Sequence, residues 1–351
     1  MSNFIHYTKK LGLIILLTFT ISVLNIKLGL AQTTAGNAIY NFLSLPYSAN
    51  MTALGGVNIS SLGDDIGLAM YNPSLLTQSM DKTISLSVKP FFAGIQQYDF
   101  MHVKYWEKKK IIWSTGVHYM NYGNISMTDF AGNEIGTMRP SDYAVQFSAA
   151  SDYIQHFSIG TSIKFIHSNY GLYKSSGMAM DIGLKYLSEN QLNQGSILVN
   201  NMGVQFNNGH SQQELPFNII IGFSKKLENA PLQFSLTADR LNIWNNVYFD
   251  PIYAQKQGES SPKYLQNLIN HITIGAELSI GKQFDFDLGY NFIRRYDLNI
   301  QNQSNGLNGF ATGFGIKLER MNIQYGTSFF QQNSYHHFTV IYKTKKYAVS
   351  F

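Results

Sequence analysis

Between residues 82 and 344, apolar and polar side chains alternate over segments of about ten residues. In the segment 111–121, one face reads Ile, Trp, Thr, Val, Tyr and the other reads Ile, Ser, Gly, His, Met. A period of two places successive side chains on opposite faces of a β-strand. Strands of globular proteins average about 5–6 residues, whereas about 9–11 are needed to cross a bilayer at a tilt. The pattern therefore predicts membrane-crossing strands.

The number and spacing of these segments predict how the strands are arranged. Fourteen strands are expected at 82–90, 97–106, 111–121, 142–151, 156–167, 176–187, 195–205, 215–225, 232–243, 268–280, 283–294, 309–318, 322–331 and 335–344. Connections after odd strands tend to be long, at 122–141, 168–175, 206–214, 244–267 and 295–308, and those after even strands are short. Short turns at one end and long loops at the other are typical of outer-membrane barrels. Because only a closed sheet pairs every backbone group in lipid, we expect an all-β fold, a fourteen-stranded antiparallel transmembrane barrel.

Composition agrees with this fold and excludes several functions. Charged residues make up 13% of the chain and hydrophobic ones 44%, against about 25% charged in a typical soluble protein. The absence of Cys excludes disulfides, thiolate metal sites, a thiol nucleophile and a lipidated cysteine. A secreted β-sandwich or propeller would also alternate, but it would not explain the strand length, the low charge or the loop pattern.

Residues 1–31 have the order of a secretory signal peptide. Lys9 and Lys10 precede an apolar run, and a small-residue cleavage site ends at Ala31. The alternative is an N-terminal membrane anchor, but Asn25 and Lys27 interrupt the apolar run before the ~20 residues of a span. Without these residues the chain has 23 basic and 21 acidic side chains, a net charge of +2, so we expect no nucleic-acid partner.

Residues 32–81 do not alternate, and we expect them to form a hatch ahead of the barrel of residues 82–351. A fourteen-stranded barrel is too wide for its own side chains to fill. The hatch contains tight-turn signals and one helix-start signal. Its expected motif residues are Leu54, Gly55, Gly56, Asp64, Asp65, Asn72 and Pro73.

The hatch carries a resemblance to a known family. Phe42-Leu43-Ser44-Leu45-Pro46 with Ser48-Ala49, then Ala53-Leu54-Gly55-Gly56, then Asn72-Pro73-Ser74, resembles the N-terminal signature of the PorV/PorQ family of Bacteroidota. The resemblance is specific over residues 41–76 and departs from the family at Asn50, where a basic residue is expected. It places the chain among FadL-like fourteen-stranded barrels.

What the resemblance implies is a role in the type IX secretion system. Members of the family sit in the outer membrane of these Gram-negative bacteria, among its lipids, within a complex that attaches secreted cargo to the cell surface. The expected partners are a PorZ-like surface protein together with PorU-like and PorV-like components.

The sequence holds no arrangement that favours catalysis, so we expect no enzyme activity, cofactor or metal. Ser279 and Lys282 match S-x-x-K, but they lie at a strand–turn–strand junction rather than at a helix start. Asp285 and Asp287 share a strand face and are either an acid pair or lumen residues that meet Lys164, Lys185, Lys317 or the hatch backbone.

Two functions from different classes follow. In the first, the barrel docks or anchors a partner through its long loops 122–141 and 244–267. Large aromatic side chains favour such contacts, and the candidates are Trp244, Tyr248, Phe249, Tyr253 and Tyr264, unless the loop packs on itself. In the second, the barrel is a FadL-like outer-membrane channel for hydrophobic small molecules. The hatch would then be its gate, with a pocket lined by Phe42, Leu43, Leu45 and Leu54; the same residues would serve a permanent plug.

Overall fold

The computed structural model describes residues 38–206, 213–244, 264–298, 306–330 and 333–344. The predicted signal peptide, with its cleavage site near Ala31, lies outside these residues.

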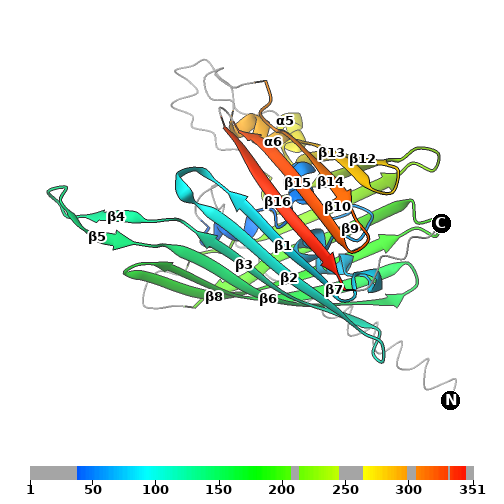
Figure 1. Cartoon of the computed structure of the whole chain (residues 1–351), viewed down its shortest axis with the longest axis horizontal. Coiled ribbons are helices and arrows are strands. Elements are labelled where there is room, and N and C mark those ends of the chain that lie inside the picture. Colours follow the sequence, from blue (N-terminus) through cyan, green and yellow to red (C-terminus); the bar gives the residue numbers. More distant parts are fainter. Residues whose placement is uncertain (1–37, 207–212, 245–263, 299–305, 331–332, 345–351) are drawn as a thin grey trace. The chain divides into compact units, whose positions relative to one another are not determined.

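Fourteen of the described strands form one closed antiparallel barrel, which confirms the predicted fold class (Figure 1). The barrel closes where Thr83 of the first strand pairs with Lys343 of the last. The barrel strands are β1 (Thr83–Pro90), β2 (Gln96–Trp106), β3 (Ile111–Asn121), β6 (Ser141–Ile154), β7 (Phe157–Tyr170), β8 (Tyr173–Leu187), β9 (Asn193–Gln205), β10 (Asn218–Lys226), β11 (Leu232–Ala238), β12 (Ile272–Ile280), β13 (Phe284–Asn291), β14 (Phe310–Lys317), β15 (Met321–Phe330) and β16 (Asn333–Lys343). We call its two ends the short-turn end, where β1 begins, and the long-loop end.

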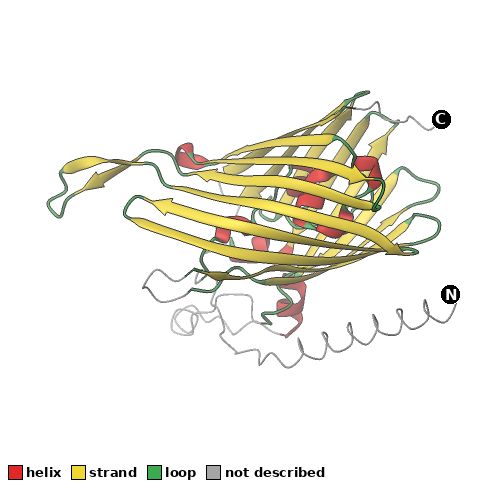
Figure 2. Cartoon of the chain, turned by 90° about the horizontal axis from the view of Figure 1, so that it is seen from below, coloured by secondary structure: helices red, strands yellow, loops and turns green. Residues whose placement is uncertain are grey.

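The structure corrects several predicted boundaries. The predicted loop 168–175 is a tight turn at Gly171-Leu172, because β7 and β8 continue their pairing to Tyr170 and Tyr173 and Gly171 has a positive φ of 73°. The predicted loop 122–141 contains a second, two-stranded sheet of β4 (Ile125–Thr128) and β5 (Glu134–Met138), which projects from the barrel in Figures 1 and 2.

Three predicted strands also extended too far. β11 ends at Ala238 instead of residue 243. Residues 268–270 belong to helix α5 (Tyr264–Asn270), and residues 292–294 belong to helix α6 (Phe292–Asp297). The α6 boundary has a local cause, because the Asn291 side chain accepts a hydrogen bond from the Arg294 amide and so caps a helix.

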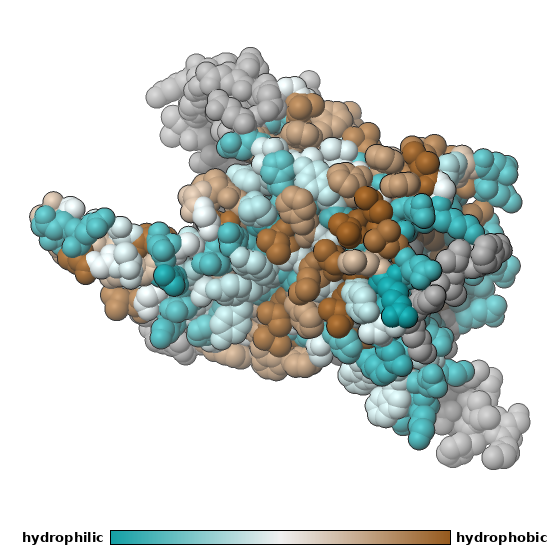
Figure 3. Space-filling view, in the orientation of Figure 1, coloured by the Kyte–Doolittle hydropathy of each residue, from teal (hydrophilic) through white to brown (hydrophobic). Residues whose placement is uncertain are grey.

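The two faces of the barrel wall differ in polarity as the alternation predicts. Outward side chains such as Leu86, Phe147 and Leu288 are about half exposed, whereas the inward Ser85 and Ser148 are buried. Figure 3 shows apolar residues gathered over part of the strand surface, polar ones over the turns, and a mixture of both on the β4–β5 hairpin. An uncharged apolar outer band is what lipid contact requires. Among the described residues, no helix has the length and hydropathy to cross a membrane.

Residues 38–82 form short helices that lie against the inner wall (Figure 2). They are η1 (Asn41–Ser44), α2 (Ala49–Ala53), α3 (Ile66–Tyr71), η2 (Pro73–Leu75) and η3 (Gln78–Met80); a further turn, η4 (Phe92–Gly94), follows β1. The Ile39 amide donates to the Glu214 carbonyl between β9 and β10, at the long-loop end. The Lys82 amide donates to Val103 of β2, at the short-turn end. The segment, which we call the hatch, therefore runs through the lumen from one end to the other.

Candidate functional site

Side-chain caps define the short helices of the hatch. Asp65 accepts hydrogen bonds from the Gly67 and Leu68 amides, at 2.7 and 3.1 Å, and so begins α3. Asn72 accepts from the Ser74 amide at 3.1 Å, with Pro73 in the first helical position of η2. These three motif residues therefore set the local geometry of the hatch. Asp64 is exposed and accepts from Thr77 at 3.1 Å, which ties the turn before α3 to the chain that follows η2.

The Gly55-Gly56 pair reverses the chain after α2. Both residues have positive φ, 97° and 93°, which side-chain-bearing residues rarely adopt. The freed Gly55 carbonyl accepts hydrogen bonds from Asn291 Nδ2 at 3.1 Å and Arg294 Nη2 at 3.0 Å. Leu54, fully buried, packs against Gly275 of the wall. The predicted Leu54-Gly55-Gly56 motif is thus a turn that is attached to the barrel through hydrogen bonds to the Gly55 carbonyl.

Inward-facing glycines let the wall touch the hatch directly. A methyl group added to Gly289 would lie 2.2 Å from the Gly55 amide nitrogen, and one added to Gly326 would lie 2.1 Å from the Ala49 carbonyl oxygen. Equivalent positions on three more strands are Gly160, Gly183 and Gly222, whose added methyl groups would meet Pro73, Asn72 and Ile59 within 2.7 Å. The wall therefore has no room for a side chain at these points.

Sequence reasoning did not identify these glycines as part of the site. Their signal was present, since glycine recurs in the polar row of several predicted strands. Glycines within the inward-facing polar row of a strand leave space beside the wall, and such space indicates that another stretch of backbone, rather than water, lies against it.

Polar side chains of the wall also bond the hatch backbone. Gln97 donates to the Pro46 carbonyl at 2.8 Å and Gln146 to the Met70 carbonyl at 2.8 Å. Gln194 donates to the carbonyls of Ser60 and Ser61 at 3.1 and 3.2 Å. Such bonds satisfy buried carbonyls that have no partner within the short helices.

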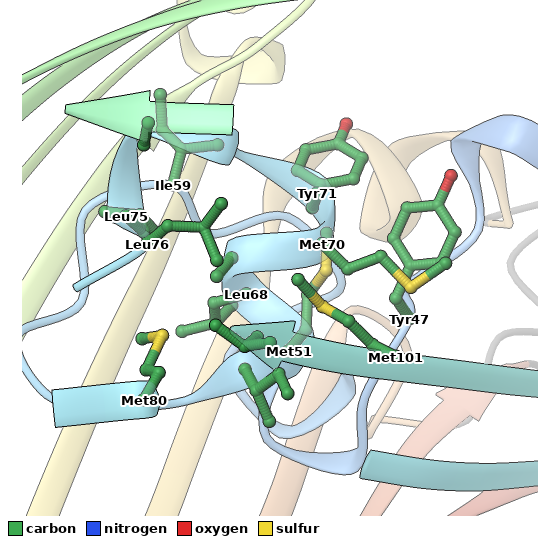
Figure 4. Close-up of a cluster of buried hydrophobic side chains, with 14 of the residues drawn as sticks. Tyr47, Met51, Ile59, Leu68, Met70, Tyr71, Leu75, Leu76, Met80 and Met101 are labelled. Atoms are coloured by element: carbon green, nitrogen blue, oxygen red, sulfur yellow. The ribbon is translucent and has the colours of Figure 1, made fainter. Parts of the chain in front are cut away.

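Apolar side chains of the hatch and of the barrel wall form a common buried core. Figure 4 shows the side chains of Tyr47, Met51, Met70 and Tyr71 converging with Met101 of β2. Burial raises the pKa of Tyr71 well above its ordinary value of 10.0, so this hydroxyl stays protonated. The cluster fills the region between hatch and wall with close contacts.

The residues expected to line a channel pocket are packed as well. Phe42 and Leu43 are buried in a second cluster with Met120 of the wall, and Leu45 packs against it. Together with Leu54 they form part of a filled boundary between hatch and wall.

A cavity of about 1300 Å³ lies at the short-turn end of the lumen. Its lining includes residues of both charges from the hatch, the wall and the turns. The charged lining residues are Asp64, Asp65, Lys185, Lys226, Glu277, Lys282, Asp285, Lys317 and Glu319. The lining of this cavity does not include the residues expected for a channel pocket, which are Phe42, Leu43, Leu45 and Leu54. These ionisable side chains keep their hydration if the cavity holds water, and contact with a hydrocarbon alone would cost that hydration.

The two aspartates predicted to share a face have different partners. Asp285 forms an ion pair with Lys317 at 2.6 Å, and Asp287 accepts a hydrogen bond from Asn50 of the hatch at 3.3 Å. The interpretation of these residues as polar lumen groups agrees with these contacts. Lys164 instead pairs with Asp181 at 2.9 Å and also donates to Asn200 and Asn201.

Asp65 connects the hatch to this cavity. Its second carboxylate oxygen accepts from Gln324 of β15 at 3.0 Å. Burial raises the pKa of the Asp65 carboxyl above its ordinary value of 3.8, against the opposing effects of the Gln324 bond and the Lys317 charge.

The candidate partner-binding loop is only partly described. Tyr248, Phe249 and Tyr253 lie outside the described residues. Trp244 is 44% exposed and packs on the Tyr264 ring, with centroids 4.7 Å apart, and on His271 at 5.8 Å. The structure thus brings Trp244 and Tyr264 together at the long-loop end, with exposed ring surface. Another exposed apolar group is Phe130 at the tip of the β4–β5 hairpin.

The described parts of the chain contain no set of three His, Asp or Glu side chains with the geometry to hold a metal ion. Ser279, from the S-x-x-K match, donates to Asp285 at 2.8 Å. His336 and His337 point to opposite faces, one exposed and one fully buried.

Solved structures of channel proteins have a similar fold. The deltaS2S3 mutant of TodX, a monoaromatic hydrocarbon channel, has a TM-score of 0.51 and 10% identity, over 84% of this chain and 97% of its own. The deltaS2 mutant of the same channel has a TM-score of 0.51 and 11% identity, over 85% and 98%. A Pseudomonas aeruginosa FadL homologue has a TM-score of 0.48 and 7% identity, over 85% and 98%. No protein-family model and no curated protein matches the sequence.

These likenesses define a class of fold. The chain is a fourteen-stranded antiparallel β-barrel with an N-terminal helical segment, in the FadL/TodX-like arrangement. At about 10% identity the likeness concerns the fold alone.

Proposed function

We propose that the protein is a non-enzymatic outer-membrane barrel of the type IX secretion system, with a PorQ-like role. It acts in the cell-surface attachment complex as anchor and docking partner of a PorZ-like surface protein, with PorU-like and PorV-like components nearby. The family resemblance of residues 41–76 supports the choice of system. The apolar outer band supports a place in the outer membrane.

The observation that carries the docking role is the close contact between hatch and wall. Added methyl groups at Gly289 and Gly326 would lie within about 2.2 Å of hatch backbone, so packed chain occupies the lumen between the short-turn cavity and the long-loop end. The free surface is then the long-loop end, where Trp244, Tyr264 and Phe130 expose apolar side chains. Exposed aromatic side chains of this kind are common anchors in protein interfaces.

Co-purification tests this proposal. The tagged full chain is extracted from outer membranes in mild detergent, and its companions are identified and quantified by mass spectrometry. We expect a stoichiometric surface protein with sortase-like and PorV-like companions. A barrel that purifies alone would contradict the proposal.

Matched variants locate the docking surface. Replacement of residues 125–138 by a short Gly-Ser linker, and the double substitution Trp244→Ala with Tyr264→Ala, should each reduce the surface protein at least tenfold. The control replaces Lys108, Lys109 and Lys110, in a turn at the opposite end, by Gly and Ser. Equal loss in the control would mean that the long-loop end is not the docking surface.

A second candidate function is a FadL-like channel for hydrophobic small molecules, favoured by the likeness to the TodX mutants at a TM-score of 0.51. The charged lining of the short-turn cavity speaks against it. Liposomes with the purified barrel would take up toluene or a fatty acid faster than empty liposomes if the channel function holds. In that case the hatch would have to move.

A further inference from the structure

Three inward-facing aromatic residues form a half-buried group at the long-loop end of the lumen. Phe91 follows β1, Phe330 ends β15, and Tyr335 lies near the start of β16. The Tyr335 ring lies 5.3 Å from that of Phe91 and 4.9 Å from that of Phe330. Because β1, β16 and β15 are neighbours in the barrel, the three rings form one continuous aromatic rim.

A cation lies beneath each end of this rim. The Lys89 ammonium is 5.2 Å from the centre of the Phe91 ring, and the Arg294 guanidinium is 4.8 Å from the centre of the Phe330 ring. Lys89 is only 3% exposed. Burial lowers the pKa of Arg294 to about 10, which leaves it charged at neutral pH. The Arg294 cation and the Lys89 side chain therefore lie near one another beneath the rim.

Neither Lys89 nor Arg294 forms an ion pair within the described residues, although Asp99 lies near enough to Lys89 to interact with it electrostatically. No carboxylate there lies within 4.0 Å of Lys89 or Arg294; the nearby Asp99 pairs with His118 instead. The sequence places only two acidic side chains outside the described residues, Asp250 and Glu259. A half-buried guanidinium without an ion-pair partner is costly, because partial burial removes some of its hydration.

Three buried side-chain groups beside these cations also lack a hydrogen-bond partner. They are Arg294 Nη1, His337 Nε2 and Ser328 Oγ. Arg294 already donates through Nη2 to the Gly55 carbonyl, and His337 Nδ1 is 2.8 Å from Thr52 Oγ1. If the Thr52 hydroxyl donates to Nδ1, the histidine carries its proton on Nε2 and is a free donor.

The strand pairing brings these groups to one level of the wall. Val88 pairs with Phe338, so the next inward pair is Lys89 opposite His337. Gly326 pairs with His337, and Ser328 is the next inward residue on that strand. Unpaired buried donors are rare in folded proteins, and several in one place indicate a missing acceptor.

From this constellation we infer a binding site for a phosphate group, either inorganic phosphate or a phosphate monoester, beneath the aromatic rim at the long-loop end. The Arg294 cation, with the Lys89 amine near it, offers positive charge and N–H donors to an anion. A guanidinium, an ammonium, an imidazole N–H and a hydroxyl can together satisfy its several acceptor oxygens. The site is independent of the partner-docking role.

Calorimetry on the purified full chain tests the inference. The protein, in detergent and in phosphate-free buffer, is titrated with inorganic phosphate, glucose 1-phosphate and sodium acetate. We expect saturable binding of the phosphates and at least tenfold weaker binding of acetate. Lys89→Met and Arg294→Gln should each weaken phosphate binding at least tenfold, and Ser328→Ala less. Lys185→Met removes another buried inward lysine, at the short-turn end, and should leave binding unchanged.

Two further arms separate the source of the phosphate and guard against misfolding. Protein reconstituted in vesicles with phosphatidic acid is extracted and analysed by native mass spectrometry. Retained lipid that blocks inorganic phosphate would identify the group as a lipid headgroup, which keeps the inference. ³¹P NMR of phosphate with the unmodified protein gives a readout that needs no variant.

Several results would overturn the inference. One is no saturable binding of phosphate in any arm. Another is acetate binding as tight as phosphate binding. A third is phosphate binding that appears only after Asp250→Asn and Glu259→Gln, which would mean that a loop of the chain neutralises Lys89 and Arg294.

Discussion

Replacement of Gly289 by alanine probes the contact on which the docking role depends. The added methyl group would lie 2.2 Å from the Gly55 amide nitrogen and 2.4 Å from the Leu54 carbonyl carbon. The three hatch atoms nearest to it are all backbone, so no flexible side chain can yield. An ordinary contact begins at 3.4 Å, which means that the hatch turn must recede by more than 1 Å.

The cost of this displacement follows from the contacts at the turn. Overpacking of a filled site costs about 1–3 kcal/mol. If the turn recedes enough to break the Gly55 carbonyl bond to Arg294, that charged bond adds about 1.5–3 kcal/mol. We expect a local loss of roughly 3–5 kcal/mol. Since about 1.4 kcal/mol corresponds to a factor of ten in an equilibrium, hatch opening should become roughly 10²–10⁴ times more frequent.

Hydrogen exchange measured by mass spectrometry detects this change. The Leu54 and Gly56 amides donate to the Asn50 and Met51 carbonyls at 2.9 Å. In Gly289→Ala they should lose protection by roughly two to four orders of magnitude. Peptides from β6 and β7, away from the turn, should keep theirs.

Gly315→Ala is the matched control. It lies on the inward face of neighbouring β14, where an added methyl group meets nothing closer than 3.7 Å. Unchanged protection of the turn in Gly289→Ala, or equal loss in the control, would refute the account of hatch packing.

Three other variants test the outer wall and the hatch caps. Leu288→Arg, on the lipid-facing side of β13, should lower the free energy of unfolding in lipid vesicles by about 2–4 kcal/mol. The control, Leu172→Arg at an exposed turn, should change this free energy by under about 0.5 kcal/mol. Equal effects of the two substitutions would contradict the placement of Leu288 against lipid. Asn72→Ala removes the η2 cap and the hydrogen bond to the Ile59 carbonyl, and it should lower the free energy of unfolding by about 1–2 kcal/mol, measured by thermal unfolding. An unchanged free energy of unfolding would contradict the role of Asn72 as a cap. Because burial raises the pKa of Asp65, the native state keeps that proton to higher pH than the unfolded chain, so stability is lost as pH rises above the ordinary value of 3.8. Asp65→Asn keeps an acceptor for the helix cap, and it should flatten the fall of the melting temperature with rising pH above 3.8. Parallel melting-temperature profiles for the variant and the unmodified protein would contradict the raised pKa of Asp65.

The barrel could be predicted from the sequence because its signal is local and repeated. Alternation needs only neighbouring residues, and fourteen repeats average out local errors. The errors arose where alternation continued beyond the true strand end. The row of 283–294 runs through Phe292, but Asn291 caps a helix there by bonding the Arg294 amide. Gly171 closes a turn where a loop of eight residues was expected.

The site was predictable only in its local parts. The Asp65 and Asn72 caps act within three residues, so sequence position alone indicates them. The bond between Arg294 and Gly55 joins residues 239 positions apart. Such pairs depend on barrel register and on the path of the hatch, and neither is encoded in a short stretch of sequence.

The same reasoning explains how one lumen can have two unlike ends. At the short-turn end, Asp285 and Lys317 neutralise each other beside the cavity of about 1300 Å³. At the long-loop end, Lys89 and Arg294 have no such partner in the described chain and lie under aromatic rings. Between the ends, hatch backbone fills the space that the wall glycines leave. The Arg294 charge has no ion-pair partner among the described residues, and it lies on the side of the exposed loops, above a closely packed hatch. This arrangement favours a lumen that presents a binding surface to the outside. It is less suited to a lumen that conducts solutes across the membrane.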